Sequence, residues 1–130
     1  MLPNFLLPES IITKNGTGPA VALGDAIGKQ LLLTVGITRI VEQESLDVEV
    51  RGSADATNWE DKPLLVFPQK FYTGTYSRVL DLTDRPDIRY VRIDYKVNRW
   101  GRGDKTPLFG FYVFAQEAEQ PAEVMHAAVA

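Results

Sequence analysis

The stretch LDVEVRGSADATNW, residues Leu46–Trp59, decides the fold class of this chain. In its first half, apolar and charged residues alternate one by one, which is the pattern of a strand with one buried and one solvated face. Its second half, Gly52–Trp59, is a run of small and polar turn-forming residues closed by an aromatic residue. The stretch therefore predicts a half-buried strand that leads into an elaborate loop.

A second strand of this kind, Ile88–Val97, ends in RYVRIDYKV. Elsewhere, turn-forming residues separate short runs that are rich in β-branched and aromatic residues. The expected strands are Ile11–Lys14, Val21–Leu23, Gln30–Val41, Leu46–Arg51, Leu64–Phe67, Tyr76–Leu82, Ile88–Val97 and Leu108–Ala115. About eight short strands without a helix between them predict an all-β fold, an antiparallel β-sandwich of the jelly-roll type.

The length of 130 residues fits one domain. Residues 1–9 contain two prolines among large apolar residues, so we expect an extended N-terminal arm rather than a helix. The sandwich domain is predicted over residues 10–115, and residues 116–130 form a C-terminal tail rich in alanine and glutamate. Apolar ends of this kind pack either on their own domain or on a neighbouring subunit.

Signals for export or membrane insertion are weak. The N-terminal apolar run has no basic region before it and is interrupted by Pro3 and Pro8, which argues against a signal peptide. No apolar stretch approaches the roughly 20 residues of a membrane-spanning helix. We therefore expect no membrane insertion and a cytoplasmic or particle-associated location.

Composition excludes several classes of function. The 14 basic and 17 acidic residues give a net charge of −3, whereas proteins that bind nucleic acid through phosphates carry a basic excess. The absence of cysteine rules out disulfides, thiolate metal sites and cysteine nucleophiles. The single histidine, His126, lies in the tail, so the body of the chain cannot form a histidine-dependent triad. We expect a protein that is not an enzyme, with no catalytic residue, no cofactor and no nucleic-acid partner.

The segments Gly52–Trp59 and Arg89–Ile93, with Leu80–Leu82 before the second, resemble the discoidin, or coagulation-factor type C, family of galactose-binding-like jelly rolls. In that family a strand leads into a Ser-x-Asp-Gly-x-x-Trp loop, and a later strand carries an Arg-Tyr-Val/Ile-Arg-Ile signature. Here Ala56 stands where the family commonly has glycine, and the family's paired cysteines are absent. The resemblance covers the middle third of the chain and implies a galactose-binding-like fold with a glycan as ligand.

The loop after the first of these strands offers two kinds of binding chemistry. Asp55, Asn58 and Asp61 are candidates for a calcium site, because their side chains offer oxygen ligands. Ca²⁺ requires six to eight oxygens, however, and three scattered residues do not make a calcium-binding motif. We favour an Asx-rich turn in which these side chains bond to their own backbone. Trp59 can stack on a sugar ring from an exposed loop or serve as a core or interface anchor. Of these two roles we favour the core.

The later loop Asn98–Thr106 surrounds Trp100 with Arg99 and Arg102. Arginine beside an aromatic residue is typical of the residues that dominate protein–protein interfaces, and it also suits a carboxylate, a phosphate or a sugar. A solvated hairpin loop with a half-buried tryptophan is the alternative. Its RWGRG run, like the earlier FPQKFY run, is similar to segments of small bacterial or phage-type β-sandwich proteins, a similarity that implies no activity.

The last predicted strand is apolar on both faces. Phe109 and Phe111 fall on one face, and Tyr112 and Phe114 fall on the other. One face must meet the core, and the other must meet loops or a partner, because an exposed aromatic row is a liability in a monomer. Cover by the N-terminal arm or the C-terminal tail is the alternative to a partner.

Two functions remain from the sequence. The first is a structural subunit, without catalytic activity, that packs with other protein subunits into a virion-like particle or another multi-subunit assembly. Its termini and its aromatic and arginine residues would make the contacts. The alternative is a glycan-binding module of the discoidin type, which would use Trp59 and Trp100. The expected binding residues for either function are Trp59, Arg99, Trp100, Arg102, Tyr112 and Phe114.

Overall fold

The computed structural model describes residues 2–41, 43–100 and 106–118. This part of the chain is built from strands, and its helical structure is limited to one 3-10 turn, η1 (Gly24–Ala26). The strands are β1 (Asn4–Ile12), β2 (Gly16–Thr17), β3 (Val21–Ala22), β4 (Gln30–Ile40), β5 (Glu44–Ser53), β6 (Leu65–Val66), β7 (Gly74–Asp81), β8 (Tyr90–Arg99) and β9 (Phe109–Glu117). The predicted all-β class is confirmed. None of the described helical structure has the length and apolar character needed to cross a bilayer.

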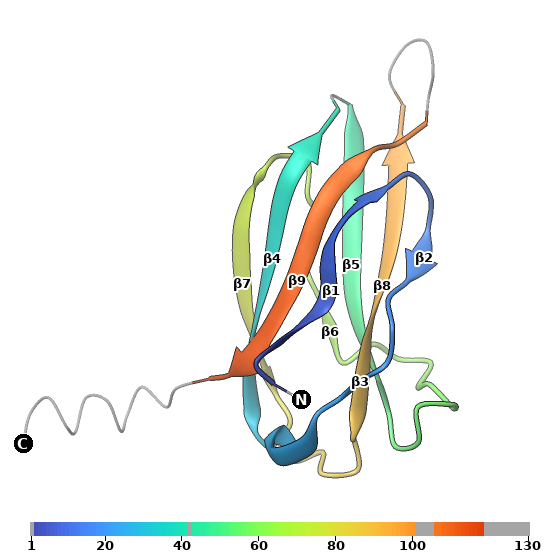
Figure 1. Ribbon diagram of the computed structural model, residues 1–130. Coiled ribbons are helices and arrows are strands. Elements are labelled where there is room, and N and C mark those ends of the chain that lie inside the picture. Colours follow the sequence, from blue (N-terminus) through green and yellow to red (C-terminus); the bar gives the residue numbers. More distant parts are fainter. Residues whose placement is uncertain (1, 42, 101–105, 119–130) are drawn as a thin grey trace, which may run out of the picture.

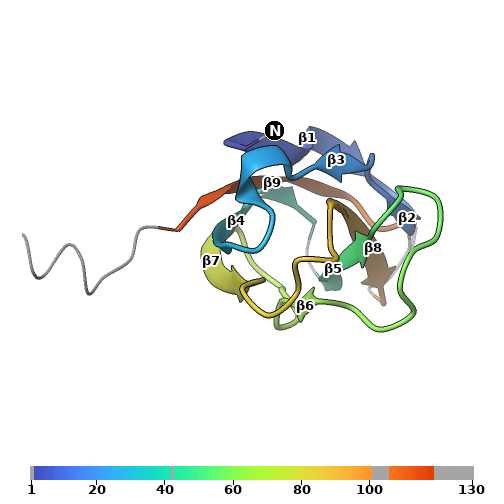
Figure 2. The same cartoon turned by 90° about the horizontal axis from the view of Figure 1, so that it is seen from below.

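Two antiparallel sheets pack face to face. We call the sheet with the order β1-β9-β4-β7 sheet A, and the sheet with the order β2-β8-β5-β6, in which β3 also pairs with β8, sheet B. Figure 1 shows the two layers from the side, and Figure 2 shows from below how they enclose the interior. The predicted antiparallel sandwich is thus confirmed.

The order of the strands is that of a jelly roll. β2 and β3 both pair with β8 and act as two halves of one edge strand. With these halves counted together, the first strand pairs with the last, the second with the last but one, and so on inward: β1 with β9, β2 and β3 with β8, β4 with β7, and β5 with β6. This nested pairing is that of one long hairpin rolled into two sheets.

The sandwich begins earlier in the chain than the sequence indicates. Asn4–Ile12, which overlap the expected arm of residues 1–9, form β1 and pair with β9 from Asn4–Ala115 to Ile12–Phe109. Leu6 is fully buried, so this segment contributes to the core. Pro8 is compatible with this strand because β1 is an edge strand, where a missing N–H is tolerated. At the other end, β9 includes two residues of the expected tail, and residues 119–130 lie outside the described residues.

The core lies between the sheets and is filled by alternate residues of the long strands. β4 lies between β9 and β7, as expected for a central strand, and its inward side chains from Leu31 to Ile37 are buried. The inward row of β9 is also fully buried, and Figure 1 shows β9 crossing the whole length of sheet A. The fully buried core residues of β4, β9, β5 and β8 are Leu31, Leu33, Val35, Phe109, Phe111, Val113, Ala115, Leu46, Val50, Val91 and Ile93.

A buried carboxylate joins three segments at one end of the sandwich. Glu44, the first residue of β5, is only 1% exposed. One of its oxygens accepts a hydrogen bond from the backbone N–H of Val41 at 2.7 Å, and the other accepts one from the N–H of Leu108 at 2.8 Å. The same side chain therefore closes the β4–β5 turn and fixes the start of β9.

We predict that Glu44→Ala lowers the free energy of unfolding by about 2–4 kcal/mol, because two partly buried N–H groups lose their acceptor. Glu44→Gln retains one carbonyl acceptor, and we expect it to lose roughly half as much. Urea denaturation followed by tryptophan fluorescence measures both variants. An alanine variant as stable as the natural chain would contradict this role for Glu44.

Candidate functional site

The residues that the sequence singles out for binding lie in three separate places. Trp59 pairs with Ser53 at the end of β5, whereas Arg99 and Trp100 lie at the opposite end of the sandwich, where β8 ends (Figure 1). Tyr112 and Phe114 lie on the outer face of sheet A. The structure therefore does not bring these residues together into one site.

The loop after β5 is organised by its own backbone. One carboxylate oxygen of Asp55 accepts hydrogen bonds from the backbone N–H groups of Thr57 and Asn58, and the other accepts one from the Asn58 side-chain amide. The Ser53 hydroxyl donates to the carbonyl oxygen of Asn58 at 2.7 Å. These are the bonds of an Asx-rich turn. Among the described residues, no group of three acidic or histidine side chains is placed to hold a metal ion.

These hydrogen bonds also set the charge state of the loop. Backbone hydrogen bonds from Asn58 and Thr57, followed by the Asn58 side-chain amide, hold the pKa of Asp55 well below its usual range. A carboxyl whose pKa is lower in the folded chain than in the unfolded chain stabilises the fold above the unfolded pKa. This contribution is lost as the pH falls through the folded pKa.

We predict that Asp55→Ala destabilises the chain at pH 7 and that the difference from the natural chain narrows as the pH falls below about 4. The variant cannot accept the loop's N–H groups, whereas the natural carboxyl loses this advantage only when it becomes protonated. Denaturation midpoints measured from pH 7 to pH 2 test this expectation. A difference that stays constant over that range would contradict it.

Trp59 is not part of the core, contrary to the role that we favour from the sequence. It is half-buried on the outer side of sheet B, where the guanidinium of Arg92 lies 4.6 Å from the centre of its ring. Arg51 donates to the carbonyl oxygen of Glu60 at 3.2 Å and also to that of Asp61. The loop therefore folds back over the sheet, and both arginines hold it there.

The outer face of sheet B is charged, and most of its charges are paired within the sheet. Arg51 contacts Glu49 at 2.8 Å and Asp94 at 3.6 Å, and Arg92 contacts Asp94 at 2.9 Å. These side chains alternate with buried apolar residues along β5 and β8. Most charges of this face therefore have an oppositely charged neighbour in the same sheet, although Nε of Arg51 is buried without a hydrogen-bond partner.

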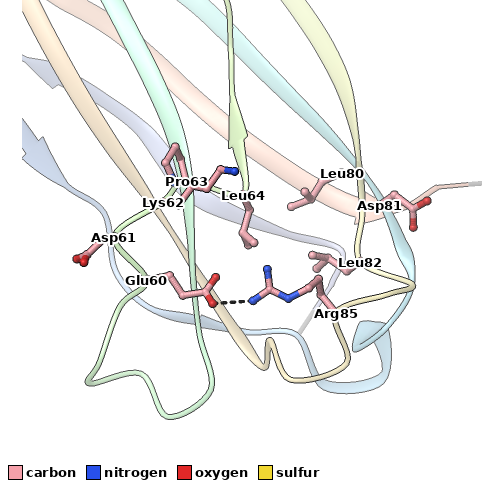
Figure 3. Close-up of a pocket in the computed structure, with 9 residues that line it drawn as sticks. All are labelled: Glu60, Asp61, Lys62, Pro63, Leu64, Leu80, Asp81, Leu82 and Arg85. Carbon is pink, nitrogen blue, oxygen red and sulfur yellow. Dashed lines mark hydrogen bonds and ion pairs between the residues drawn. The ribbon is translucent and has the colours of Figure 1, made fainter.

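A cleft of about 630 Å³ lies near one end of the sandwich, between the segment before β6 and the end of β7 (Figure 3). Leu64, Leu80 and Leu82 converge on its interior. At its mouth, Arg85 contacts Glu60 at 2.6 Å. Two further carboxylates line the cleft but point away from it, as Figure 3 shows, namely Asp61 and Asp81.

The guanidinium of Arg85 at this cleft is already neutralised. Arg85 also contacts Asp87 at 3.1 Å, and hydrogen bonds to Asp87 and Glu60 raise the pKa of the guanidinium. Hydrogen bonds from Thr83 lower the pKa of Asp81. With two carboxylates on one guanidinium, the cleft offers no unpaired positive charge to an anionic ligand through Arg85.

The outer face of sheet A is different in character. Phe5 of β1 packs edge-on against Tyr112 and Phe114 of β9, with ring centres 5.8 and 5.0 Å apart. These three residues, which we call the aromatic cluster, line a hollow of about 390 Å³ together with Thr34 and Glu9. The ring of Tyr112 lies on Gly36 of β4, where a Cβ atom would overlap it. The expected aromatic row is therefore present on this face.

The N-terminal segment covers the aromatic row only in part. Phe5 shields one side of Tyr112 and Phe114 but remains 44% exposed itself. Across the sheet, Val79 of β7 is 53% exposed on the same face. The sequence does not identify Phe5 as a site residue. Pro3 and Pro8 on either side of it indicate an extended arm, and nothing local shows the strand pairing that places Phe5 beside Phe114.

A second group of exposed aromatic residues lies where β8 ends. Trp100 packs edge-on against Phe71 with ring centres 6.2 Å apart, and Phe71 neighbours Tyr72 at 6.5 Å. Trp100 is 49% exposed and Tyr72 is 76% exposed. Arg102, the other arginine predicted in this loop, lies outside the described residues. Phe71 and Tyr72, adjacent in the sequence and just before Gly74, are the feature of the sequence that could have indicated this group.

Comparison with known proteins adds no relative. No protein-family model, no curated protein sequence and no solved structure matches this chain. The two segments that resemble the discoidin family are neighbours in the fold, since Ser53 pairs with Tyr90 and accepts a hydrogen bond from Arg89 at 3.0 Å. The features of the structure that bear on function are therefore the outer faces of the two sheets and the loops at the two ends of the sandwich.

Proposed function

We propose that this protein is a non-enzymatic subunit of a larger protein assembly and that it makes contact through the outer face of sheet A. The observation that supports this most is the contrast between the two outer faces. The outer face of sheet B carries arginines and carboxylates that form ion pairs with one another. The outer face of sheet A instead carries the aromatic cluster and, beside it on β4, the uncharged Thr34. Aromatic residues that gather on one face are characteristic of protein interfaces.

The middle of this face carries no charge on β4 or β7. The outward residues of β4 include Leu32, Thr34 and Gly36, and they face Val79, Ser77 and Thr75 of β7. The charged residues on the described part of this face include Glu9, Arg39 and Asp81, and these lie toward its margins. A surface with an uncharged centre and a charged rim resembles an interface, whose core is depleted of charged residues and whose rim is polar.

We predict that Phe114→Lys removes the chain from its assembly, because an ammonium group in the aromatic cluster must be desolvated when a partner covers it. Size-exclusion chromatography of an extract from cells that produce the chain measures this. The natural chain should elute in a particle much larger than its own 14.5 kDa. The variant should shift toward that mass.

The matched control is Lys96→Glu, which reverses a charge on the outer face of sheet B. It should leave the elution of the particle unchanged. Circular dichroism shows whether each variant keeps the sandwich. Deleting residues 1–9 is not a suitable test, because it would remove Leu6 and Leu7 from the core. A natural chain that elutes at its own mass would contradict the assembly function.

A glycan-binding module is the second candidate, and the exposed rings of Trp100 and Tyr72 support it, because aromatic faces at a surface stack on sugars. Trp59 is less suited to this role, since Arg92 already occupies a face of its ring. We predict that Trp100→Ala abolishes any binding to a glycan array, while Trp59→Ala retains it. Absence of binding by the natural chain would exclude this function for the sugars tested.

A further inference from the structure

The four edges of the two sheets differ in how they are protected against pairing with another chain. Exposed edges are normally protected by shortness, proline, bulges or charge. β1 contains Pro8 and has register shifts on both sides of Leu7. β2 and β3 have two residues each and are separated by Pro19. β6 also has two residues, between Pro63 and Pro68.

The remaining edge, β7, is not protected by shortness, proline or a bulge, and Arg78 is the one charged residue near its centre. All eight residues from Gly74 to Asp81 pair with β4 in one continuous register, and the strand contains no proline. Within the described structure, its other side pairs with no strand. Its residues are exposed except Tyr76, which is half-buried, and Leu80. About half of its N–H and C=O groups point toward this free edge, as in any antiparallel strand.

We propose that two copies of this chain pair through β7, in antiparallel orientation about a two-fold axis, and so join their A sheets into one eight-stranded sheet. The proposal deepens the assembly function, on which it rests, by naming a second copy as the partner. A long edge strand adds backbone hydrogen bonds without any change in the fold. The two-fold arrangement is the commonest one for oligomers of identical chains.

The sequence of β7 favours one register. In an antiparallel pair, residues directly opposite each other lie on the same face, so a two-fold axis must place one residue opposite its own copy. An axis at Arg78 would oppose two like charges, which destabilises a sheet. An axis at Ser77 instead opposes two hydroxyl side chains and places Thr75 opposite Val79 of the second copy, a favourable pair of β-branched residues.

Continuity with the outer face of sheet A also favours a second copy. Ser77 and Val79 point to the same side as the aromatic cluster, through the pairs Thr34–Ser77 and Leu32–Val79. Pairing about Ser77 therefore extends the uncharged face across both chains and brings two aromatic clusters onto one surface. An extended peptide from another protein would gain the backbone hydrogen bonds but not this continuity.

The test is sedimentation velocity of the purified full chain over a concentration series. The natural chain should form a dimer of twice the 14.5 kDa chain mass. Ser77→Glu and Ser77→Lys should each raise the dimer dissociation constant about fivefold or more, because like charges then meet at the axis. An equimolar mixture of the two variants should restore the dimer, because opposite charges then face each other.

Ser10→Glu, on the protected edge β1, is the matched control and should leave the dimer unchanged. The proposal is overturned by a monomeric natural chain, by a Ser77→Glu variant that dimerises normally, or by a mixture that fails to restore the dimer. These results can be separated from failure of the assembly function. A chain that is monomeric when purified but elutes in a large particle from cell extract overturns the β7 pairing alone.

Discussion

The insertion of β9 between β1 and β4 is the interaction on which the rest of the structure depends. It joins the first described strand to the last, since Asn4 pairs with Ala115, and its inward side chains fill the middle of the core. Without β9, both β1 and β4 would lose a pairing partner, and the core would open toward solvent. Pairings between residues so distant in sequence are formed late and slowly, because a long loop must be closed first. The jelly roll is therefore complete only when its last strand is in place.

The two outer faces show how one architecture can present two different surfaces. On sheet B, two directly opposed pairs carry like charges, with Glu49 opposite Asp94 and Arg51 opposite Arg92, whereas Asp47 is opposite Lys96. The diagonal contact from Arg51 to Asp94 and the contacts along each strand relieve this repulsion. The charges therefore bind each other and the loop after β5, which leaves sheet B with little attraction for a partner. Among the residues that the structure describes, no comparable network lies on the outer face of sheet A, and the proposed assembly uses that difference.

The sequence predicted the fold class because alternation in Leu46–Arg51 and Ile88–Val97 is a local property that one face of a sheet imposes on a strand. It also identified Tyr112 and Phe114 as a second apolar row. It missed β1 because proline disfavours both helix and central strand, and the tolerance of an edge strand depends on a partner distant in the chain. The order of the strands and the buried role of Glu44 were hidden for the same reason. From the sequence alone, a single carboxylate next to a turn is expected to be exposed to solvent. The burial of Glu44 becomes evident only when Leu108, which is distant in the chain, is placed beside it.

Gly36 of β4 and Tyr112 of β9 depend on each other on the outer face of sheet A. The ring of Tyr112 occupies the space that a side chain at position 36 would fill, so two positions in different strands share one volume. In evolutionary terms, the two positions are expected to vary together. A larger residue at position 36 would require a smaller one at position 112, and a small residue at 112 would free position 36 from glycine. Related sequences should therefore keep one large side chain at this place on the face, supplied either by position 112 of β9 or by position 36 of β4.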